Sequence, residues 1–209
     1  MKQLLIIGAR GFGREIFNML PHCIGYGAEF EVKGFLDDKT DALDGMAGYP
    51  PIIESVEQYV PQQDDVFTCA LGDAKWKSHY VDIILKKSGV FINIIHDTVL
   101  IGRNTIIGNG CVFCQNVDIS CDTVVNDFVT IQSGANVGHD AKISNFCHLG
   151  VRSFMGGHSM LGDLSTIQTG AIILPKIRVG SNCMVGAGAV VIKKVPDGET
   201  VYGNPARRL

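Results

Sequence analysis

The feature that most constrains this chain is a six-residue repeat in its second half. Counting forward from residue 101 in steps of six, sixteen consecutive positions carry a large apolar residue, without an insertion. The positions are Ile101, Ile107, Phe113, Ile119, Val125, Ile131, Val137, Ile143, Leu149, Met155, Leu161, Ile167, Ile173, Val179, Val185 and Val191. In a chain that is 46% hydrophobic, chance would produce such a run with a probability of roughly 10⁻⁵, so the repeat indicates a structural period.

Each hexad has a second inward position, four residues after the large one. It holds a smaller or apolar residue, as at Thr105, Cys111 and Ala135. Glycine often follows the large residue directly, and we interpret it as supplying the permissive dihedrals of a corner; these glycines are Gly102, Gly108, Gly138, Gly150, Gly162, Gly180 and Gly186. Each hexad is then one short strand plus one corner. Three hexads close a triangular coil, and residues 18 apart stack at the ~4.8 Å spacing of paired strands.

The first ninety residues follow a different pattern, in which buried strands alternate with helices. Strands are predicted over residues 2–7, 32–36 and 66–71, and a helical stretch over 14–20. A second helix contains Trp76, Tyr80 and Ile84, with Trp76 expected in the core. This order predicts a small βαβ domain, too short for a two-lobed dinucleotide fold. A mononucleotide such as a nucleotide-sugar therefore fits better than NAD.

Turn residues after these strands suggest where a nucleotide binds. The glycines Gly8, Gly11 and Gly13 lie between the first strand and its helix, where backbone N–H groups can approach a phosphate. The second strand ends in Asp37 and Asp38, at the place where an acidic side chain contacts a ribose or base in nucleotide-binding folds. Alternatively, the acidic pair only caps the strand, and the glycines serve only tight packing of strand against helix.

Charge and cysteine usage exclude several classes of protein. The formal charge is −3, from 18 Lys and Arg against 21 Asp and Glu, and no basic run is long enough to bind nucleic acid. Charged residues follow the apolar start so closely that neither a signal peptide nor a membrane span fits, so a cytoplasmic protein is expected. The seven cysteines show no disulfide framework and are predicted to be free thiols. The pair Cys111 and Cys114 has no second CxxC, so no zinc site is predicted.

The stretch VGHDAK places His139 beside Asp140 at a corner of the repeat. Histidine suits the role of a general base at neutral pH, and the carboxylate would orient the ring. The 18-residue spacing stacks His139 next to Gly157, whose missing side chain we interpret as room for a substrate, and Asp140 next to His158. A cluster of ionisable groups is therefore predicted at this corner. The alternative is a solvent-facing polar corner without chemistry.

The endings FLDD and ALGD, the hexad repeat, the HD pair and the final YGNPARRL together resemble the NeuD/PglD-type sugar acyltransferases, over essentially the whole chain. The resemblance implies an α/β N-terminal Rossmann-like βαβ domain over residues 1–94. An all-β left-handed parallel β-helix with a C-terminal tail would follow over 95–209. It also implies a homotrimer with acetyl-CoA in the groove between neighbouring prisms, and no metal.

The resemblance also assigns candidate site residues. His139 would be the general base and Asp140 its acidic partner. Substrate-binding residues would be Gly11, Phe12, Gly13, Asp37, Asp38, Gly72 and Gln132. Cofactor-binding residues would be His148, Gly157, Thr169, Gly170, Ala187 and Gly188. The chain departs from the family at two positions that would face the sugar. Many relatives have His where this chain has Phe12, and the branch that it resembles most tends to carry Asn where this chain has Gln132.

The function implied is an acetyl-CoA-dependent N-acetyltransferase acting on the 4-amino group of a nucleotide-linked amino-deoxy sugar. An O-acetyltransferase of the sialic acid type is the nearest alternative, since a hydroxyl needs the same base. A metal-dependent hydratase of the gamma carbonic anhydrase type is a second, although the spacing of His139, His148 and His158 differs from that family's. A non-catalytic nucleotide-sugar sensor is a third. The sugar, the nucleotide, the acyl chain length and the pathway stay open.

Overall fold

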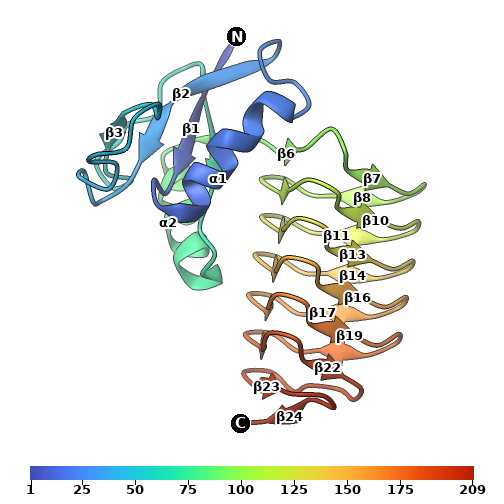
Figure 1. Cartoon of the computed structure of the whole chain (residues 1–209). Helices are drawn as coiled ribbons and strands as arrows, with labels where there is room; N and C mark the ends of the chain where they lie inside the picture. The colour runs from blue at the N-terminus through green and yellow to red at the C-terminus, as the bar shows by residue number, and fades with distance from the viewer. The chain divides into compact units, whose positions relative to one another are not determined.

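A computed structural model describes all 209 residues. The chain divides into two units, Met1–Ile94 and Ile95–Leu209; the first mixes helices and strands, and the second is a stack of coils (Figure 1). No helix has both the length and the apolar character that crossing a membrane requires.

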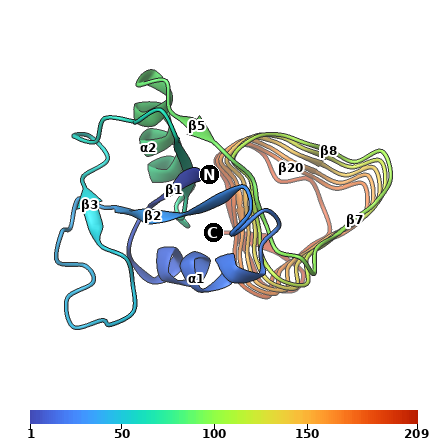
Figure 2. The same ribbon diagram turned by 90° about the horizontal axis from the view of Figure 1, so that it is seen from above.

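The first unit is a five-stranded parallel sheet with strand order β3-β2-β1-β4-β5. Its elements are β1 (Lys2–Ile7), α1 (Gly11–Met19), the 3₁₀ helix η1 (Leu20–His22), β2 (Phe30–Leu36), β3 (Ile52–Glu54), β4 (Asp65–Cys69), α2 (Ala74–Lys86) and β5 (Val90–Phe91). Figure 2 shows α1 and α2 on opposite sides of this sheet. The central strand β1 is a continuous buried apolar run from Leu4 to Ile7, as expected for a parallel strand covered on both faces.

The strand order creates a switch point beside β1. The chain runs from β1 to β2 and β3 on one side, then crosses to β4 and β5 on the other. Because all strands are parallel, the carboxyl ends of β1, β2 and β4 meet at one edge, where open α/β sheets bind ligands. The predicted helix starts three residues too late, because α1 already begins at Gly11. Gly11 and Gly13 therefore belong to its first turn.

The second unit is a parallel β-helix of two-residue strands spaced by six residues. The strands are β6 (Ile94–Ile95), β7 (Leu100–Ile101), β8 (Ile106–Ile107), β9 (Val112–Phe113), β10 (Asp118–Ile119), β11 (Val124–Val125), β12 (Thr130–Ile131), β13 (Asn136–Val137), β14 (Lys142–Ile143), β15 (His148–Leu149), β16 (Phe154–Met155), β17 (Met160–Leu161), β18 (Thr166–Ile167), β19 (Ile172–Ile173), β20 (Arg178–Val179), β21 (Met184–Val185), β22 (Val190–Val191), β23 (Thr200–Tyr202) and β24 (Arg207–Arg208). Partners along the repeat lie 18 residues apart, as in the pair Ile119 and Val137. The predicted period is therefore confirmed.

Three sheets form the faces of this prism. We call the sheet of β7, β10, β13, β16, β19 and β22 the first face, that of β8, β11, β14, β17 and β20 the second, and that of β6, β9, β12, β15, β18, β21, β23 and β24 the third. The corner between the first and second faces is the 1–2 edge, and the corner between the third and first faces is the 3–1 edge. The large hexad residues from Phe113 onward are at most 2% exposed. Ile101 is 42% exposed, because no coil precedes its own.

The corners are made by a different position from the one predicted. Every sixth residue from Asn104 to Gly188 has a positive φ, and this position is the third after the large residue. The glycines directly after the large residue have none. A Cβ added at Gly138 would lie 2.6 Å from the backbone nitrogen of Gly157 in the next coil. The dihedral interpretation of these glycines is therefore wrong: they allow successive coils to stack closely.

Candidate active site

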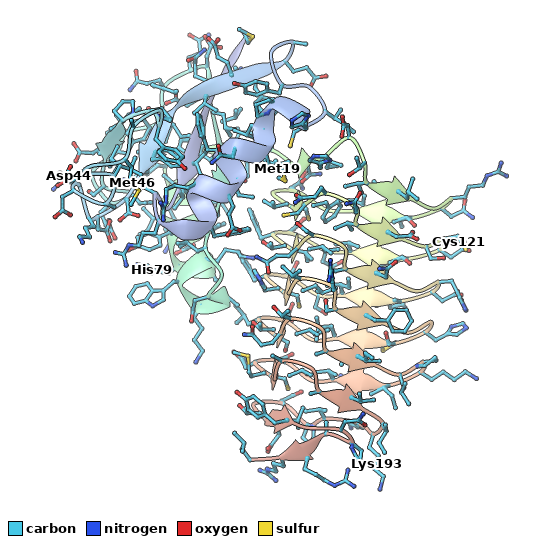
Figure 3. All side chains as sticks on the ribbon, in the orientation of Figure 1. Met19, Asp44, Met46, His79, Cys121 and Lys193 are labelled. Atoms are coloured by element: carbon cyan, nitrogen blue, oxygen red, sulfur yellow. The ribbon has the colours of Figure 1, made fainter.

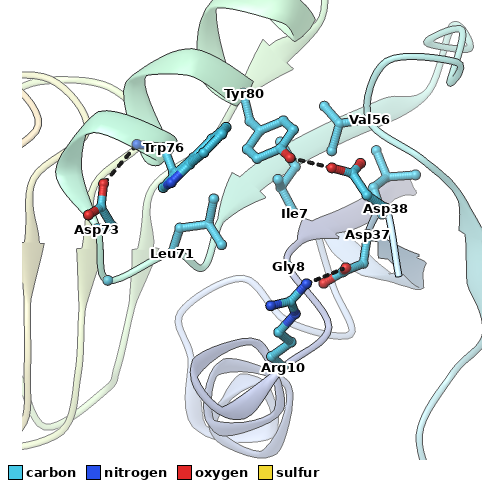
Figure 4. A pocket seen from close by; sticks show the side chains of 12 residues that line it. Ile7, Gly8, Arg10, Asp37, Asp38, Val56, Leu71, Asp73, Trp76 and Tyr80 are labelled. Atoms are coloured by element: carbon cyan, nitrogen blue, oxygen red, sulfur yellow. Dashed lines mark hydrogen bonds and ion pairs between the residues drawn. The ribbon is translucent and has the colours of Figure 1, made fainter. Parts of the chain in front are cut away.

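A pocket of about 390 Å³ lies at the carboxyl ends of β1, β2 and β4 (Figure 4). Its lining residues are Ile7, Gly8, Arg10, Leu36, Asp37, Asp38, Val56, Leu71, Gly72, Asp73, Trp76 and Tyr80. Three predicted substrate residues, Asp37, Asp38 and Gly72, are among them. The pocket therefore occupies the switch point, where a nucleotide is expected.

Asp37 is buried in the wall of this pocket, with its oxygens already engaged. Its Oδ2 accepts a hydrogen bond of 2.9 Å from the backbone N–H of Ala9, and its Oδ1 accepts one of 2.9 Å from Lys39. The guanidinium of Arg10 lies 3.8 Å from Oδ1. Asp37 is only 8% exposed, and its bond from Ala9 links the turn after β1 to the end of β2.

Asp38 is exposed and accepts a hydrogen bond from the Tyr80 hydroxyl, which reaches it from α2 (Figure 4). Burial, assisted by this bond to the carboxylate, raises the pKa of Tyr80 far above its ordinary value. The phenol therefore stays protonated at physiological pH and acts as a donor to Asp38.

Trp76 was expected in the core, and this prediction is wrong. The side chain is 58% exposed and lines the pocket. Its ring stacks against Tyr80 with a centroid distance of 6.0 Å and an interplanar angle of 27°. The first turn of α2 is held by Asp73, whose Oδ1 accepts hydrogen bonds of 2.9 Å from the backbone N–H groups of Lys75 and Trp76. A helical period of three to four predicts one apolar face but does not say whether that face lies over the core or at the rim of a pocket.

The predicted residues Gly11, Phe12 and Gly13 form the first turn of α1 and do not line the pocket. A Cβ at Gly13 would lie 1.8 Å from the carbonyl oxygen of Gly8, so tight packing against β1 already requires glycine there. Arg10, the N-cap of α1, makes no side-chain capping bond. Asp73, in contrast, caps α2 with its side chain. The positive end of the α1 dipole favours an anion nearby. Gly8 of the predicted glycine turn does line the pocket, and so does Arg10, which sequence reasoning missed.

The second candidate site is the His139–Asp140 pair on the 1–2 edge. Nδ1 of His139 lies 2.7 Å from Oδ2 of Asp140, and the side chains are 55% and 45% exposed. Asp140 occupies the positive-φ corner position, which Asp tolerates better than most residues. Nε2 of His158 lies 3.8 Å from the same carboxylate oxygen, and its ring is perpendicular to that of His139. The ionisable groups predicted to stack at this corner therefore do come together.

Asp122 lies one coil earlier on the same edge. A 2.9 Å hydrogen bond from the side-chain amide of Asn104 lowers the pKa of its carboxyl, and the charge of His139 contributes. The corner therefore keeps a second anionic group near His139 at neutral pH.

Gly157 contacts the ring of His139. A Cβ at Gly157 would lie 2.7 Å from Nε2 and 2.9 Å from Cε1 of that ring. The interpretation of Gly157 as room for a substrate is therefore wrong in its detail, because the imidazole itself fills this space.

The 1–2 edge also offers a donor set for a cation. His139, Asp140 and His158 each present a ligand atom within 4.8 Å of the others, and all three are exposed. His148 does not join them. It is buried on β15 of the third face, so the three histidines named for the hydratase alternative do not gather within one chain.

The remaining predicted cofactor residues lie on the 3–1 edge. Thr169 and Gly170 occupy one coil, and Ala187 and Gly188 the next, with the Gly188 N–H donating to the Thr169 carbonyl at 2.9 Å. A Cβ at Gly170 or Gly188 would meet nothing within 4 Å, so this edge is open. The predicted substrate residue Gln132 follows β12 on the same edge. One chain therefore places the His139 pair and these residues on different edges of the prism.

Two features together define the class of the hexapeptide-repeat sugar acyltransferases. One is a hexad β-helix with an imidazole–carboxylate pair at a corner, and the other is a preceding parallel sheet with a pocket at its switch point. Comparisons with known proteins agree. The family model "PglD N-terminal domain" matches residues 3–84. A GDP-perosamine N-acetyltransferase of Escherichia coli O157:H7 is 28% identical over 98% of this chain and 95% of its own length.

Solved structures match the whole chain. The acetyltransferase domain of PglB from Neisseria gonorrhoeae FA1090 is 30% identical, with a TM-score of 0.90 and full coverage of both chains. Its complex with acetyl coenzyme A gives a TM-score of 0.89 at 29% identity and covers 100% of this chain and 99% of that one. PerB from Caulobacter crescentus, solved with CoA and GDP-perosamine, has a TM-score of 0.89 at 23% identity over 100% of this chain and 98% of its own, and supports the fold alone.

The chain belongs to the NeuD/PglD-type sugar acyltransferases. The predicted fold class, with its left-handed β-helix, is confirmed by these matches. The predicted enzyme class, an acyl-CoA-dependent acetyltransferase, is confirmed as well, and acetyl-CoA is the donor present in the gonococcal relative.

Proposed function

We propose that this protein transfers the acetyl group of acetyl-CoA to the 4-amino group of a nucleotide-linked amino-deoxy sugar, with His139 as general base. The main observation behind this proposal is the 2.7 Å hydrogen bond between His139 Nδ1 and Asp140. It leaves Nε2 as the ring nitrogen that can accept a proton. The similarity to a GDP-perosamine N-acetyltransferase over nearly the whole chain supports an amine as acceptor.

The pair performs the proton transfers of a direct reaction. The amine nitrogen of the sugar attacks the thioester carbonyl and forms a C–N bond, while Nε2 of His139 takes a proton from that amine. Asp140 accepts the Nδ1–H bond, fixes the ring tautomer and stabilises the imidazolium. The C–S bond then breaks, and the departing CoA thiolate takes the proton from the imidazolium. The products are the amide and CoA, and the imidazole is neutral again.

The division of predicted residues between two edges supports a homotrimer. The His139 pair lies on the 1–2 edge, whereas Thr169, Gly170, Ala187 and Gly188 lie on the 3–1 edge. Acetyl-CoA in a groove between two prisms would contact the 3–1 edge of one copy and the base of another. His148, on the third face, would then contact the acetyl-CoA. We expect this reaction in the cytoplasm.

The nucleotide moiety would occupy the pocket of the first unit. The guanidinium of Arg10, which lines this pocket, and the positive end of the α1 dipole would attract the diphosphate. Gly72 and the carboxylate of Asp38 line the same pocket.

The test is thiol release from acetyl-CoA in the presence of UDP-, GDP- or dTDP-linked 4-amino sugars, each beside its 4-hydroxyl counterpart. We expect turnover with an amino sugar and a loss of about 10²- to 10⁴-fold in kcat for His139→Ala. Turnover with hydroxyl sugars alone would move the protein to the O-acetyltransferases. Full activity of His139→Ala would refute the base assignment. Nucleotide-sugar binding without any turnover would favour the sensor.

A further inference from the structure

The nucleotide pocket has one wall that the family resemblance did not predict. Trp76 and Tyr80, one turn apart on α2, both line it. Trp76 is the single tryptophan of the chain and keeps 58% of its side chain exposed. Its backbone N–H is held by Asp73, so the exposed ring is presented from a fixed helical turn. A large exposed aromatic surface at the rim of a pocket is typical of a ligand-stacking site.

We propose that the ring of Trp76 is the surface on which the nucleobase stacks, and that Asp38, positioned by Tyr80, recognises the base through its ring N–H. This inference rests on the proposed binding of a nucleotide-sugar and specifies the part of that substrate which the pocket selects.

Asp38 is assigned this role rather than Asp37 because of their hydrogen bonds. Both oxygens of Asp37 already accept backbone N–H bonds, and its side chain is almost fully buried. Asp38 is exposed, and its one side-chain partner is the Tyr80 hydroxyl on Oδ2. Its Oδ1 accepts no hydrogen bond within the chain, and Asp38 lines the pocket. The hydroxyl of Tyr80 remains a donor at neutral pH and holds the carboxylate in place without competing for its remaining lone pairs.

A carboxylate in this position discriminates among bases by their donors. Guanine presents a ring N–H and an adjacent amino group and can make two bonds to a carboxylate. Uracil and thymine present one ring N–H. Adenine and cytosine present a ring nitrogen lone pair at the equivalent place, which repels a carboxylate. Guanine is therefore the expected base, followed by uracil and thymine, with adenine and cytosine disfavoured.

Because Trp76 is the single tryptophan, its fluorescence reports directly on stacking. The experiment is a titration of the intact protein with GDP, UDP, dTDP, ADP and CDP, followed by tryptophan emission and, in parallel, by calorimetry. We expect quenching by GDP at the lowest concentration. Trp76→Ala should weaken binding of all bound nucleotides by about 10- to 100-fold, whereas Trp76→Phe should retain most of the affinity. Asp38→Asn should remove the preference for GDP over ADP.

Two results would overturn the inference. One is nucleotide binding by calorimetry without a change in emission, which would place the base away from Trp76. The other is an unchanged ratio of GDP affinity to ADP affinity in Asp38→Asn, which would show that Asp38 does not recognise the base. Circular dichroism of each variant serves as the folding control. The titration needs no acetyl transfer, so turnover without quenching refutes this inference alone, and quenching without turnover refutes the proposed enzymatic function alone.

Discussion

Gly157→Ala tests how the base is positioned. The new Cβ would lie 2.7 Å from Nε2, 2.9 Å from Cε1 and 3.1 Å from Cδ2 of His139, whereas unstrained contacts of this kind need ~3.5–4.0 Å. The ring must therefore move by roughly 1 Å, and a displacement of that size costs about 10²-fold in rate when a catalytic group is involved. The side chain of His139 is 55% exposed, so it can rotate outward. We therefore expect little loss of stability.

The assay is a double-mutant cycle on kcat, measured by thiol release, with thermal unfolding as the folding control. If Gly157→Ala acts only by displacing His139, it should lower kcat about 10²-fold in the parent and have almost no effect in the His139→Ala background. Acetyl-CoA binding, measured by calorimetry in both backgrounds, should stay unchanged.

The opposite pattern would refute this reasoning. The family resemblance implies that Gly157 lies on the path of acetyl-CoA. In that case the added methyl group would weaken acetyl-CoA binding by a similar factor whether or not His139 is present. Such a result would show that Gly157 contacts the cofactor rather than supporting the base.

Three further predictions concern other residues of the molecule. Asp140→Asn should lower kcat about 10- to 100-fold with little change in KM, because the amide no longer stabilises the imidazolium; a change of less than threefold in the same assay would exclude the orienting role. Asp65→Asn should lower the free energy of unfolding by about 1–3 kcal/mol in urea melts at pH 7, because it removes a buried carboxylate that lies 2.7 Å from Lys33. Burial opposes ionisation of Asp65, but hydrogen bonds from Lys33 and neighbouring groups outweigh it and lower the pKa of this carboxyl. The difference should therefore be complete above the ordinary pKa of 3.8 and shrink as the pH falls below it, and an equal difference at pH 3 and pH 7 would contradict the assignment. N-ethylmaleimide should label one thiol per native chain, Cys121, because the other six cysteines are buried. The hydrogen bond between Cys121 and Asp122 raises the pKa of the thiol, so labelling should be slower than that of free cysteine. A second labelled site found by mass spectrometry would refute this prediction.

The β-helix could be predicted from the sequence because the direction of each side chain along a short strand is a local property. The six-residue period continues without an insertion, so every coil has the same length and residues 18 apart must stack. His139 and Asp140 are neighbours in the chain, and the repeat places His158 one coil away. The composition of this corner was therefore readable from the sequence.

The same repeat did not reveal what each glycine does. Gly138 and Gly157 are needed for close approaches, one to a backbone nitrogen and the other to the imidazole of His139. A glycine that permits a positive φ and a glycine that leaves space look identical in a sequence, and only the packed coils distinguish them.

The amino-acid sequence by itself determined the two architectures, the edge of the sheet that carries the acidic pair, and the histidine–carboxylate pair. Tertiary structure alone decided that Asp38 rather than Asp37 keeps an open oxygen, and that Trp76 lines a pocket. The physical reason is that local periodicity sets where a side chain points, whereas its availability depends on partners distant in the chain. The backbone N–H groups of Ala9 and Lys39 donate hydrogen bonds to the two carboxylate oxygens of Asp37, and α2 places Trp76 at the rim of the pocket.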